Sequence, residues 1–302
     1  GQVQTYTRRR RHRLQYRFVQ VLTESAFPCG CVPISGQLQR AIFHADGYAR
    51  MTPPREIRPA HGNEMKNMNR NVEHNVQREE VANAIWKGKA IMGTDGSVRD
   101  PTATYSFVIS ISQNEVKTNV RGGGYLPSTA KYLDPYSKRP EAAALLAGLT
   151  WIKKLLRNFP NHTDAEPPPL PIPIDNNSVV KDVHRTINAQ TPTYDLLSPD
   201  HDILQAIRTV INDRPIRTDI SHVHAHQDRH KQWHELDRRE QINVLADKQA
   251  NAIYRLPHHK TGLFPSWSPG TRAALFHGEQ QVTKGIHSYI RDAAHTPPMK
   301  EY

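Results

Sequence analysis

The sequence is poor in cysteine and in long apolar runs, and each shortage excludes a class of protein. Only two of its 302 residues are cysteine, which excludes a disulfide-stabilised scaffold and predicts a reducing, intracellular location, nuclear or cytoplasmic. No apolar run approaches the roughly 18 residues that a membrane-spanning helix requires, so we expect that this protein is not an integral membrane protein. The chain begins at Gly1 without an apolar signal-peptide core, and we expect a fragment of a longer protein.

Acidic residues are also in deficit. Asp and Glu number 29 against 40 Lys and Arg, so the formal net charge is +11. A positive charge of this size favours a polyanionic partner, nucleic acid first and an anionic membrane surface second. The apolar share of 37% is below that of an average globular domain, which indicates one well-packed domain with poorly packed flanks.

The N-terminal segment carries much of the positive excess. Residues 1–80 hold 13 Lys and Arg but only 7 Asp and Glu. We predict that residues 1–85 form a basic, weakly structured segment, mostly loop with one short helix. Its most concentrated block is a run of four arginines, expected to be a solvated tail or a contact to nucleic acid: Arg8, Arg9, Arg10 and Arg11.

The hydrophobic pattern of residues 86–256 predicts a mixed α/β fold. An apolar strand at 90–92 precedes a hairpin formed by strands at 105–111 and 115–120, and three glycines at 122–124 then predict a long loop. Leu145, Leu149, Ile152 and Leu156 give residues 141–159 the clearest helical stripe.

Strands and helices alternate after that helix. The remaining predictions are a strand ending at 174, helices from 177 and from 198, a strand at 219–224 and a helix at 234–256. This order predicts a mixed sheet with parallel crossovers. Residues 257–302 are predicted to be a C-terminal extension, largely loop, with a helix around 282–292.

Four acidic residues lie where such a fold collects ligands. Asp95 and Asp175 close two strands, Glu141 opens the first long helix, and Asp247 lies on the last helix. Carboxylates brought together repel one another unless cations neutralise them. Oxygen ligands without a cysteine or histidine shell suit Mg²⁺ or Mn²⁺ better than zinc.

The motifs around these acids occur in the order of an RNase H domain. They are TDGS at 94–97, PEAAALLAGL at 140–149, IDNNSVV at 174–180, VHAHQD at 223–228 and NVLADKQAN at 243–251. The sequence resembles the RNase H segment at the C-terminal end of retroelement reverse transcriptases. The resemblance implies a three-layer RNase H-like fold over residues 86–256, with a mixed five-stranded sheet and helices on both faces. It also makes residues 1–85 a candidate remnant of a covalently linked upstream reverse transcriptase region.

The same resemblance implies an activity. Members of this family hydrolyse the RNA strand of an RNA–DNA hybrid, with two Mg²⁺ ions (Mn²⁺ as the alternative) held by residues matching Asp95, Glu141, Asp175 and Asp247. His226 matches the family's loop histidine, which would shuttle a proton or help product leave. Candidates for reading the 2′-hydroxyl of RNA in the hybrid partner are Gly96, Ser97, Asn176 and Asn177.

Three alternatives stay open on the sequence alone. Any one of the four acids could be a surface carboxylate or a helix cap, and only the set of four favours a metal site. A catalytically inactive RNase H fold would keep the positive surface as a nucleic-acid-binding or assembly module. A DNA-processing nuclease or transposase of the same fold is the third alternative. Trp151, Trp233 and Trp267 are candidates for base stacking, although a mid-helix position favours buried packing for Trp151.

Overall fold

The structure is a computed structural model that describes most of the central part of the chain. The described residues are 68–99, 102–126, 138–161, 166–188, 199–213 and 217–256, together with the backbone of short strands at 2–7, 10–20, 262–263, 273–277 and 280–282. Among these residues no helix is both long and apolar enough to cross a membrane.

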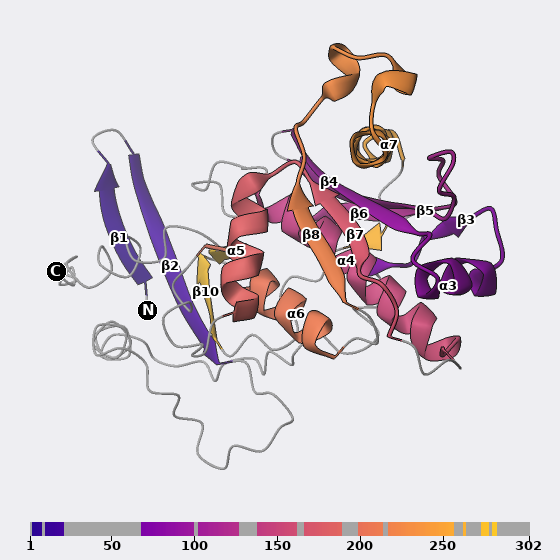
Figure 1. The fold of residues 1–302 in the computed structure, drawn as a ribbon. Helices are drawn as coiled ribbons and strands as arrows, with labels where there is room; N and C mark the ends of the chain where they lie inside the picture. The colour runs from indigo at the N-terminus through magenta and orange to yellow at the C-terminus, as the bar shows by residue number, and fades with distance from the viewer. Residues whose placement is uncertain are drawn as a thin grey trace, which may run out of the picture.

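A mixed sheet forms the centre of the molecule (Figure 1). Strands β4 (Ile91–Arg99), β5 (Thr102–Ser110) and β6 (Val120–Leu126) form an antiparallel meander. Strands β7 (Leu170–Ile174) and β8 (Thr218–His222) pair in parallel, and β7 lies beside β4. Two short strands, β3 (Glu73–His74) and β9 (Gly262–Leu263), extend the outer edge at β6. Backbone hydrogen bonds order the antiparallel strands as β3, β6, β5, β4, and they pair β7 with β8 separately, so that β7 contacts β4 without a ladder among the described residues. The predicted combination of an antiparallel meander with a parallel crossover is confirmed, and a single five-stranded sheet stays a prediction.

Helices cover both faces of this sheet. Helix α7 (Arg238–Ile253) packs on one face, and α4 (Lys138–Asn158) packs on the other. The face with α4 also carries α3 (Arg78–Trp86), α5 (Asn177–Asn188) and α6 (His201–Asn212).

The alternation of side chains along β4 explains the two layers, because successive residues of a strand point to opposite faces. Ile91 packs with Ile242 and Ala246 of α7. The next residue, Met92, lies against Gly148 of α4 in the larger core. The predicted three-layer α/β fold is therefore confirmed.

One predicted loop is a strand. Gly122 to Gly124 belong to β6, and the hairpin strand predicted at 115–120 reaches the sheet only at Val120. The prediction was wrong because glycine normally interrupts strands, whereas here the lack of a side chain permits close packing. A Cβ atom on Gly123 would lie 2.3 Å from the Tyr105 carbonyl oxygen and 2.5 Å from Cδ1 of Ile253 on α7.

Helix α7 begins at Arg238, four residues later than the hydrophobic pattern predicts. Its start is fixed by a reciprocal cap, in which the Asp237 carboxylate accepts a 2.8 Å bond from the Glu240 N–H. The Glu240 carboxylate in turn accepts a 2.9 Å bond from the Asp237 N–H. This capping box fixes the first residue of α7. The residues before it form the short 3₁₀ helix η3 (Trp233–Glu235) and are not part of α7.

The flanking segments contain strands that were not predicted. Strand β2 (Arg10–Gln20) pairs with β1 (Gln2–Thr7) and with β10 (Ala273–His277), so the two ends of the chain meet in one sheet. Leu14, Tyr16 and Phe18 alternate with polar residues, which is a strand pattern that the neighbouring arginines obscured. Val282 lies in strand β11 (Gln280–Val282), and the rest of the helix predicted at 282–292 falls outside the described residues.

The packed core also begins before residue 86. Met68, Val81 and Ile85 are buried in the same cluster as Leu145 of α4. Residues 68–85 are thus part of the α/β unit rather than of a weakly structured segment.

Candidate metal centre

Three of the predicted acids meet at one point. Asp95 lies in β4, Glu141 in the first turn of α4, and Asp175 directly after β7. One carboxylate oxygen from each residue lies within 4.8 Å of the other two, and this is the only such group of metal-ligating side chains among the described residues. The three acids are far apart in the sequence. They meet because β4 lies beside β7 and because α4 begins next to β4.

Gly96 explains how the start of α4 comes so near to β4. A Cβ atom at this position would lie 2.3 Å from the Glu141 backbone nitrogen and 2.4 Å from the Pro140 carbonyl carbon. Backbone atoms cannot move aside as a flexible side chain can, so only glycine permits this approach. The Gly96 peptide N–H is also hydrogen-bonded to the neighbouring carboxyl groups of Asp95 and Glu141.

We expect Gly96→Ala to push α4 away from β4 and to separate Asp95 from Glu141. The added methyl group should lower the free energy of unfolding by about 1–3 kcal/mol, as is typical of overpacking. Urea unfolding measures the loss, and Ser97→Ala is the matched control because its side chain lies outside this contact. Equal stability of the two variants would contradict the close-approach explanation.

The centre is buried, and burial makes its negative charges costly. Burial raises the pKa of Asp95 to about 8, and the charges of Asp175 and Asp247 add to the rise. Burial likewise raises the pKa of Glu141 well above its usual value, with further contributions from Asp95 and Asp175. A bound cation would offset both effects, because it stabilises the ionised carboxylates.

Two buried oxygen atoms of the centre lack hydrogen-bond partners, namely Oδ2 of Asp95 and Oε2 of Glu141. Buried polar atoms are nearly always satisfied, so each such atom requires an explanation. Carboxylate oxygens are the ligands that hard divalent cations prefer. The residues present therefore fit a divalent metal ion.

The fourth acid, Asp247, approaches the group from the opposite layer. It is half-buried on α7, and burial raises its pKa, whereas the nearby His226 lowers it and Asp228 and Asp175 raise it further. Asp247 does not belong to the group that meets within 4.8 Å. It shares an electrostatic environment with Asp95 and Asp175, as expected for a site built from four carboxylates.

His226 is exposed and sits just before the 3₁₀ helix η2 (Gln227–Arg229). Its φ of 51° lies in the left-handed region, which non-glycine residues rarely adopt. The loop at His226 and η2 contacts α7, and the charge of His226 lowers the pKa of Asp247 on that helix.

Two asparagines of the site were not predicted. Asn251 Nδ2 donates a 2.9 Å hydrogen bond to Oδ1 of Asp247, and Asn243 Nδ2 lies 3.4 Å from Oδ2 of Asp175. They precede and follow Asp247 by four residues, so all three share one face of α7. This spacing was visible in the sequence and could have identified them.

A buried arginine also supports the start of α4. Arg139 donates to both carboxylate oxygens of Asp202 at 2.9 and 2.8 Å and to Asp200 at 3.2 Å. All three side chains are at least nine-tenths buried. Arg139 thereby ties the first turn of α4, which carries Glu141, to the start of α6.

The structure describes only some of the residues that were predicted to contact nucleic acid. The Asn176 side chain accepts a 3.3 Å bond from the Val179 N–H and so caps α5, as predicted, while Asn177 is exposed. Ser97 is half-buried beside Gly96. Arg8 and Arg9 lie outside the described residues, and only the backbone of Arg10 and Arg11, in β2, is described.

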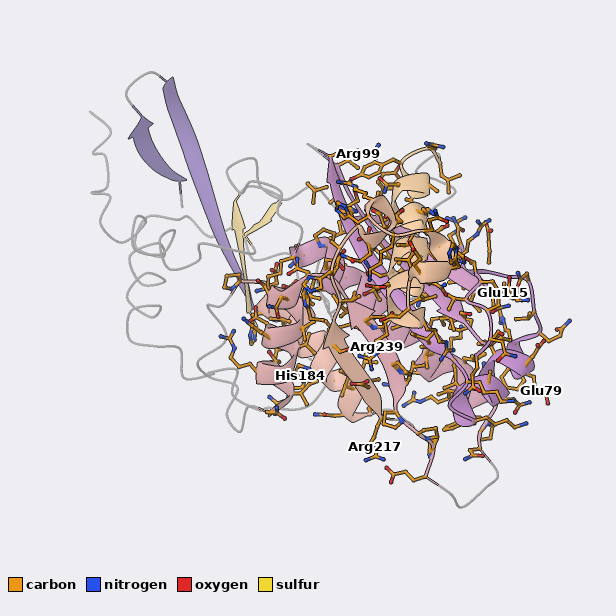
Figure 2. The ribbon with its side chains drawn as sticks, turned by 45° about the horizontal axis from the view of Figure 1, so that its top comes forward. Glu79, Arg99, Glu115, His184, Arg217 and Arg239 are labelled. Atoms are coloured by element: carbon orange, nitrogen blue, oxygen red, sulfur yellow. The ribbon has the colours of Figure 1, made fainter. Side chains whose placement is uncertain are left out.

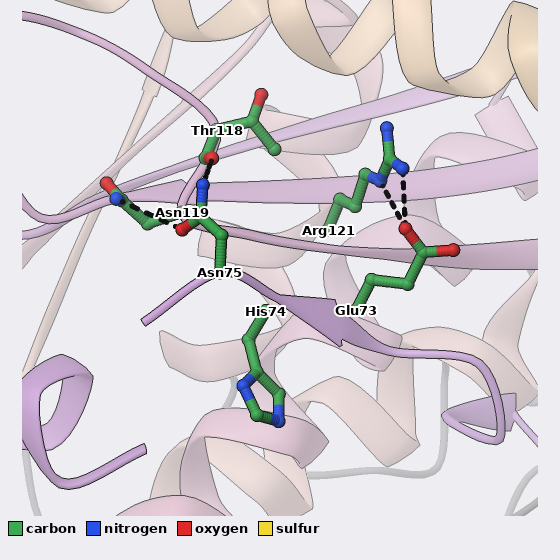
Figure 3. A pocket seen from close by; sticks show the side chains of 6 residues that line it. All are labelled: Glu73, His74, Asn75, Thr118, Asn119 and Arg121. Atoms are coloured by element: carbon green, nitrogen blue, oxygen red, sulfur yellow. Dashed lines mark hydrogen bonds and ion pairs between the residues drawn. The ribbon is translucent and has the colours of Figure 1, made fainter. Parts of the chain in front are cut away.

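A pocket of about 300 Å³ opens at the other edge of the sheet, between β3 and β6 (Figure 3). It is lined by Glu73, His74, Asn75, Thr118, Asn119 and Arg121. The charge of Arg121 is paired with Glu73 at 2.5 Å, and Asn75 Nδ2 donates to the Thr118 carbonyl at 3.0 Å. These contacts are internal to the pocket, and we assign it no ligand.

Comparisons with known proteins return solved structures of RNase H1 domains. One is LC11-RNase H1 in complex with an RNA/DNA hybrid, with 17% identity over 54% of this chain and 95% of that chain and a TM-score of 0.36. Another is RNase H1 from Halobacterium salinarum NRC-1, with 16% identity over 55% and 97% and a TM-score of 0.34. A third is the N-terminal RNase H domain of rv2228c from Mycobacterium tuberculosis, with 15% identity over 55% and 93% and a TM-score of 0.35.

No family model and no curated protein sequence matches the chain. The class of protein is therefore defined by the strand order, the two helical layers and the acidic centre. The described residues form an α/β fold with helices on both faces, and it contains a group of three carboxylates, two of them buried, that is able to bind a divalent metal ion.

Proposed function

We propose that this protein is a divalent-metal-dependent nuclease that hydrolyses the RNA strand of RNA–DNA hybrids. The observation that carries the proposal is the convergence of Asp95, Glu141 and Asp175 to within 4.8 Å at a buried site. A purely structural role would leave these charges costly, because burial and mutual repulsion raise the pKa values of Asp95 and Glu141. The order of the motifs around the acids, which resembles RNase H, directs the proposal to hybrid cleavage.

Asp95, Glu141, Asp175 and Asp247 would hold two Mg²⁺ ions, with Mn²⁺ as a substitute. Bound there, such ions would acidify a water molecule and neutralise the charge that develops on the scissile phosphate and its leaving oxygen. Asn243 and Asn251 orient two of the ligands, Asp175 and Asp247, by the hydrogen bonds described above. Arg139 and Gly96 keep Glu141 beside Asp95.

His226 is exposed and lies just before η2, which contacts α7, the helix that carries Asp247. We assign His226 the transfer of a proton to or from the reacting groups, or the release of product. Asn177, Asn176, Ser97 and Gly96 lie around the acids and are proposed to contact the sugar and phosphate groups of the RNA strand. The Gly96 N–H is already hydrogen-bonded to the carboxyl groups of Asp95 and Glu141. Gly96 would therefore assist RNA binding only by leaving space for the strand. The block at Arg8 to Arg11 is proposed to add salt-dependent contacts to phosphates.

The retroelement context is a further part of the proposal. It is supported by the resemblance of the motifs to the RNase H segment of retroelement reverse transcriptases, and by the basic segment that precedes the α/β unit. In this context residues 1–85 would derive from a linked upstream reverse transcriptase region. An intracellular location, nuclear or cytoplasmic, stays a prediction from the cysteine content.

Cleavage of an end-labelled RNA–DNA hybrid tests the function. We expect cleavage with Mg²⁺ that stops when a chelator is added, and 5′-phosphate and 3′-hydroxyl ends on the RNA fragments. Duplex DNA of the same sequence is the control and should remain intact. Binding of the hybrid without hydrolysis in saturating Mg²⁺ or Mn²⁺ would instead favour the inactive nucleic-acid-binding module, and cleavage of duplex DNA would favour a DNA-processing nuclease.

A further inference from the structure

Trp233 is held in an exposed position against α7, the helix that carries Asp247. Among the described residues, the large hydrophobic side chains that are exposed are Trp233, at 40%, and Leu256, at 43%. Exposure of one apolar side chain is common and requires no explanation by itself. The surroundings of Trp233 distinguish it, because several contacts fix the short segment that presents it.

Contacts to α7 and within η3 hold the segment that carries Trp233. Gln241 Nε2 donates a 2.8 Å bond to the Trp233 carbonyl oxygen. The Glu235 carboxylate accepts a 2.6 Å bond from the Gln232 N–H and closes the 3₁₀ helix η3. Lys231 pairs with Glu240 in the first turn of α7 at 2.6 Å. The indole is therefore presented by an ordered segment rather than by a free loop.

The base of this segment is joined to the sheet as well. Arg239, which Figure 2 labels, lies in the first turn of α7. Its guanidinium donates to the Ser221 hydroxyl and to Asp219 of β8, each at 2.7 Å. Strand β8 in turn lies beside β7, which ends at Asp175. The segment that carries Trp233 is thus connected through α7 and β8 to the elements next to Asp247 and Asp175.

A cation accompanies the indole. Lys248 Nζ lies 5.8 Å from the centre of the Trp233 ring, within the range of a cation–π contact. Lys248 is exposed and follows Asp247 directly on α7. An aromatic face next to an exposed ammonium group, on the helix that carries Asp247, offers stacking for a base and charge for its phosphate.

We propose that Trp233 and Lys248 bind an unpaired nucleotide where a single strand leaves the hybrid beside the cleavage site. Bases within a hybrid are stacked on their neighbours and cannot offer a free face, whereas a base in a single-stranded overhang can stack on the indole. Lys248 contacts the adjacent phosphate. The preferred substrate is then a hybrid with a single-stranded extension rather than a blunt hybrid. This inference rests on the proposed function and names its substrate more narrowly.

Affinities for overhanging and blunt hybrids test the inference, measured in a full-length Asp95→Asn background so that no substrate is consumed. The parent should bind the overhanging hybrid more tightly, and Trp233→Ala should lose about 5- to 150-fold in affinity for it, the range expected for one stacked base, while its affinity for the blunt hybrid stays the same. Trp233→Phe should restore part of the loss, and Lys248→Ala should reduce both the affinity and its salt dependence. Leu256→Ala is the matched control and should bind as the parent does.

Two results would overturn the inference. The first is equal loss of affinity for both hybrids in Trp233→Ala, which would indicate a structural role for the indole. The second is unchanged affinity for the overhanging hybrid in Trp233→Ala. Failure of the parent to bind either hybrid would instead overturn the proposed function itself.

Discussion

Replacing Asp95 with asparagine should abolish hybrid cleavage while the fold is retained. Asparagine has nearly the same shape as aspartate but cannot supply the negative charge that a divalent cation requires. Loss of several kcal/mol of transition-state stabilisation corresponds to a fall in the cleavage rate on the order of a thousandfold. Single-turnover cleavage of a labelled hybrid in Mg²⁺ measures this loss.

The same substitution should not lower the stability of the metal-free protein. The unfolded Asp95 carboxyl ionises near its usual pKa of 3.8, whereas the folded one stays protonated up to a pKa of about 8. Between these values the unfolded state is favoured as the pH rises, and asparagine removes that dependence. Thermal unfolding in chelator at pH 7.5 should give Asp95→Asn a melting temperature at or above that of the parent. Asp213→Asn, which changes an exposed carboxylate on the far end of α6, is the control for activity and should cleave as the parent does.

Replacing Arg139 with methionine should produce the largest loss of stability. Burial alone would raise the pKa of Asp202, but the charge and hydrogen bonds of Arg139 outweigh burial and hold that pKa below its usual value. Removing the guanidinium leaves Asp202 buried without its cation, which typically costs about 3–5 kcal/mol. Urea unfolding measures the change in the free energy of unfolding.

Arg157→Met on the same helix is the matched control. Arg157 also pairs with an aspartate of the α6 region, Asp213, but both side chains are 60% exposed. Exposed pairs contribute little, so this variant should unfold near the denaturant concentration of the parent. Equal losses in the two variants would contradict the assigned role of the buried arginine. Arg139→Met should also lower cleavage at limiting metal concentration, because Glu141 lies two residues further along the first turn of α4.

The periodic elements of the fold were predictable, and the departures have physical causes. The stripe of α4 and the end of β7 follow from side-chain spacing alone. The end of β4 was placed wrongly, because the strand continues past Asp95 to Arg99 through its pairing with β5. The strand at Gly122–Gly124 was missed because Gly122 packs closely against Phe107 and Gly123 against Ile253 of α7, and a local sequence pattern does not contain such tertiary contacts. The start of α7 was misplaced because the apolar pattern extends back to residue 234, whereas the cap at Asp237 and Glu240 decides the boundary.

Glu141, Asp175 and Asp247 were predictable because they lie at the start of a helix, directly after a strand and on the face of a helix, whereas Asp95 lies within β4 and was identified by the motif around it. Asn243 and Asn251 share that helical face with Asp247 and were recoverable from their spacing. Arg139 was not recoverable, because an arginine in a first helical turn ordinarily faces solvent. Its partners Asp200 and Asp202 lie at the start of α6, which only the tertiary fold brings near.

Calorimetric titration of the full chain with Mn²⁺ at pH 7, in two buffers of different ionisation enthalpy, tests most directly whether the carboxylates bind divalent ions. Because the pKa of Asp95 is raised to about 8, its carboxyl is mostly protonated in the metal-free protein at this pH and must lose its proton when the ion binds. We predict saturable binding with net proton release, and loss of both in Asp95→Asn. Coincident titrations of the parent and Asp95→Asn, or binding with no dependence on the buffer, would contradict the proposed metal centre.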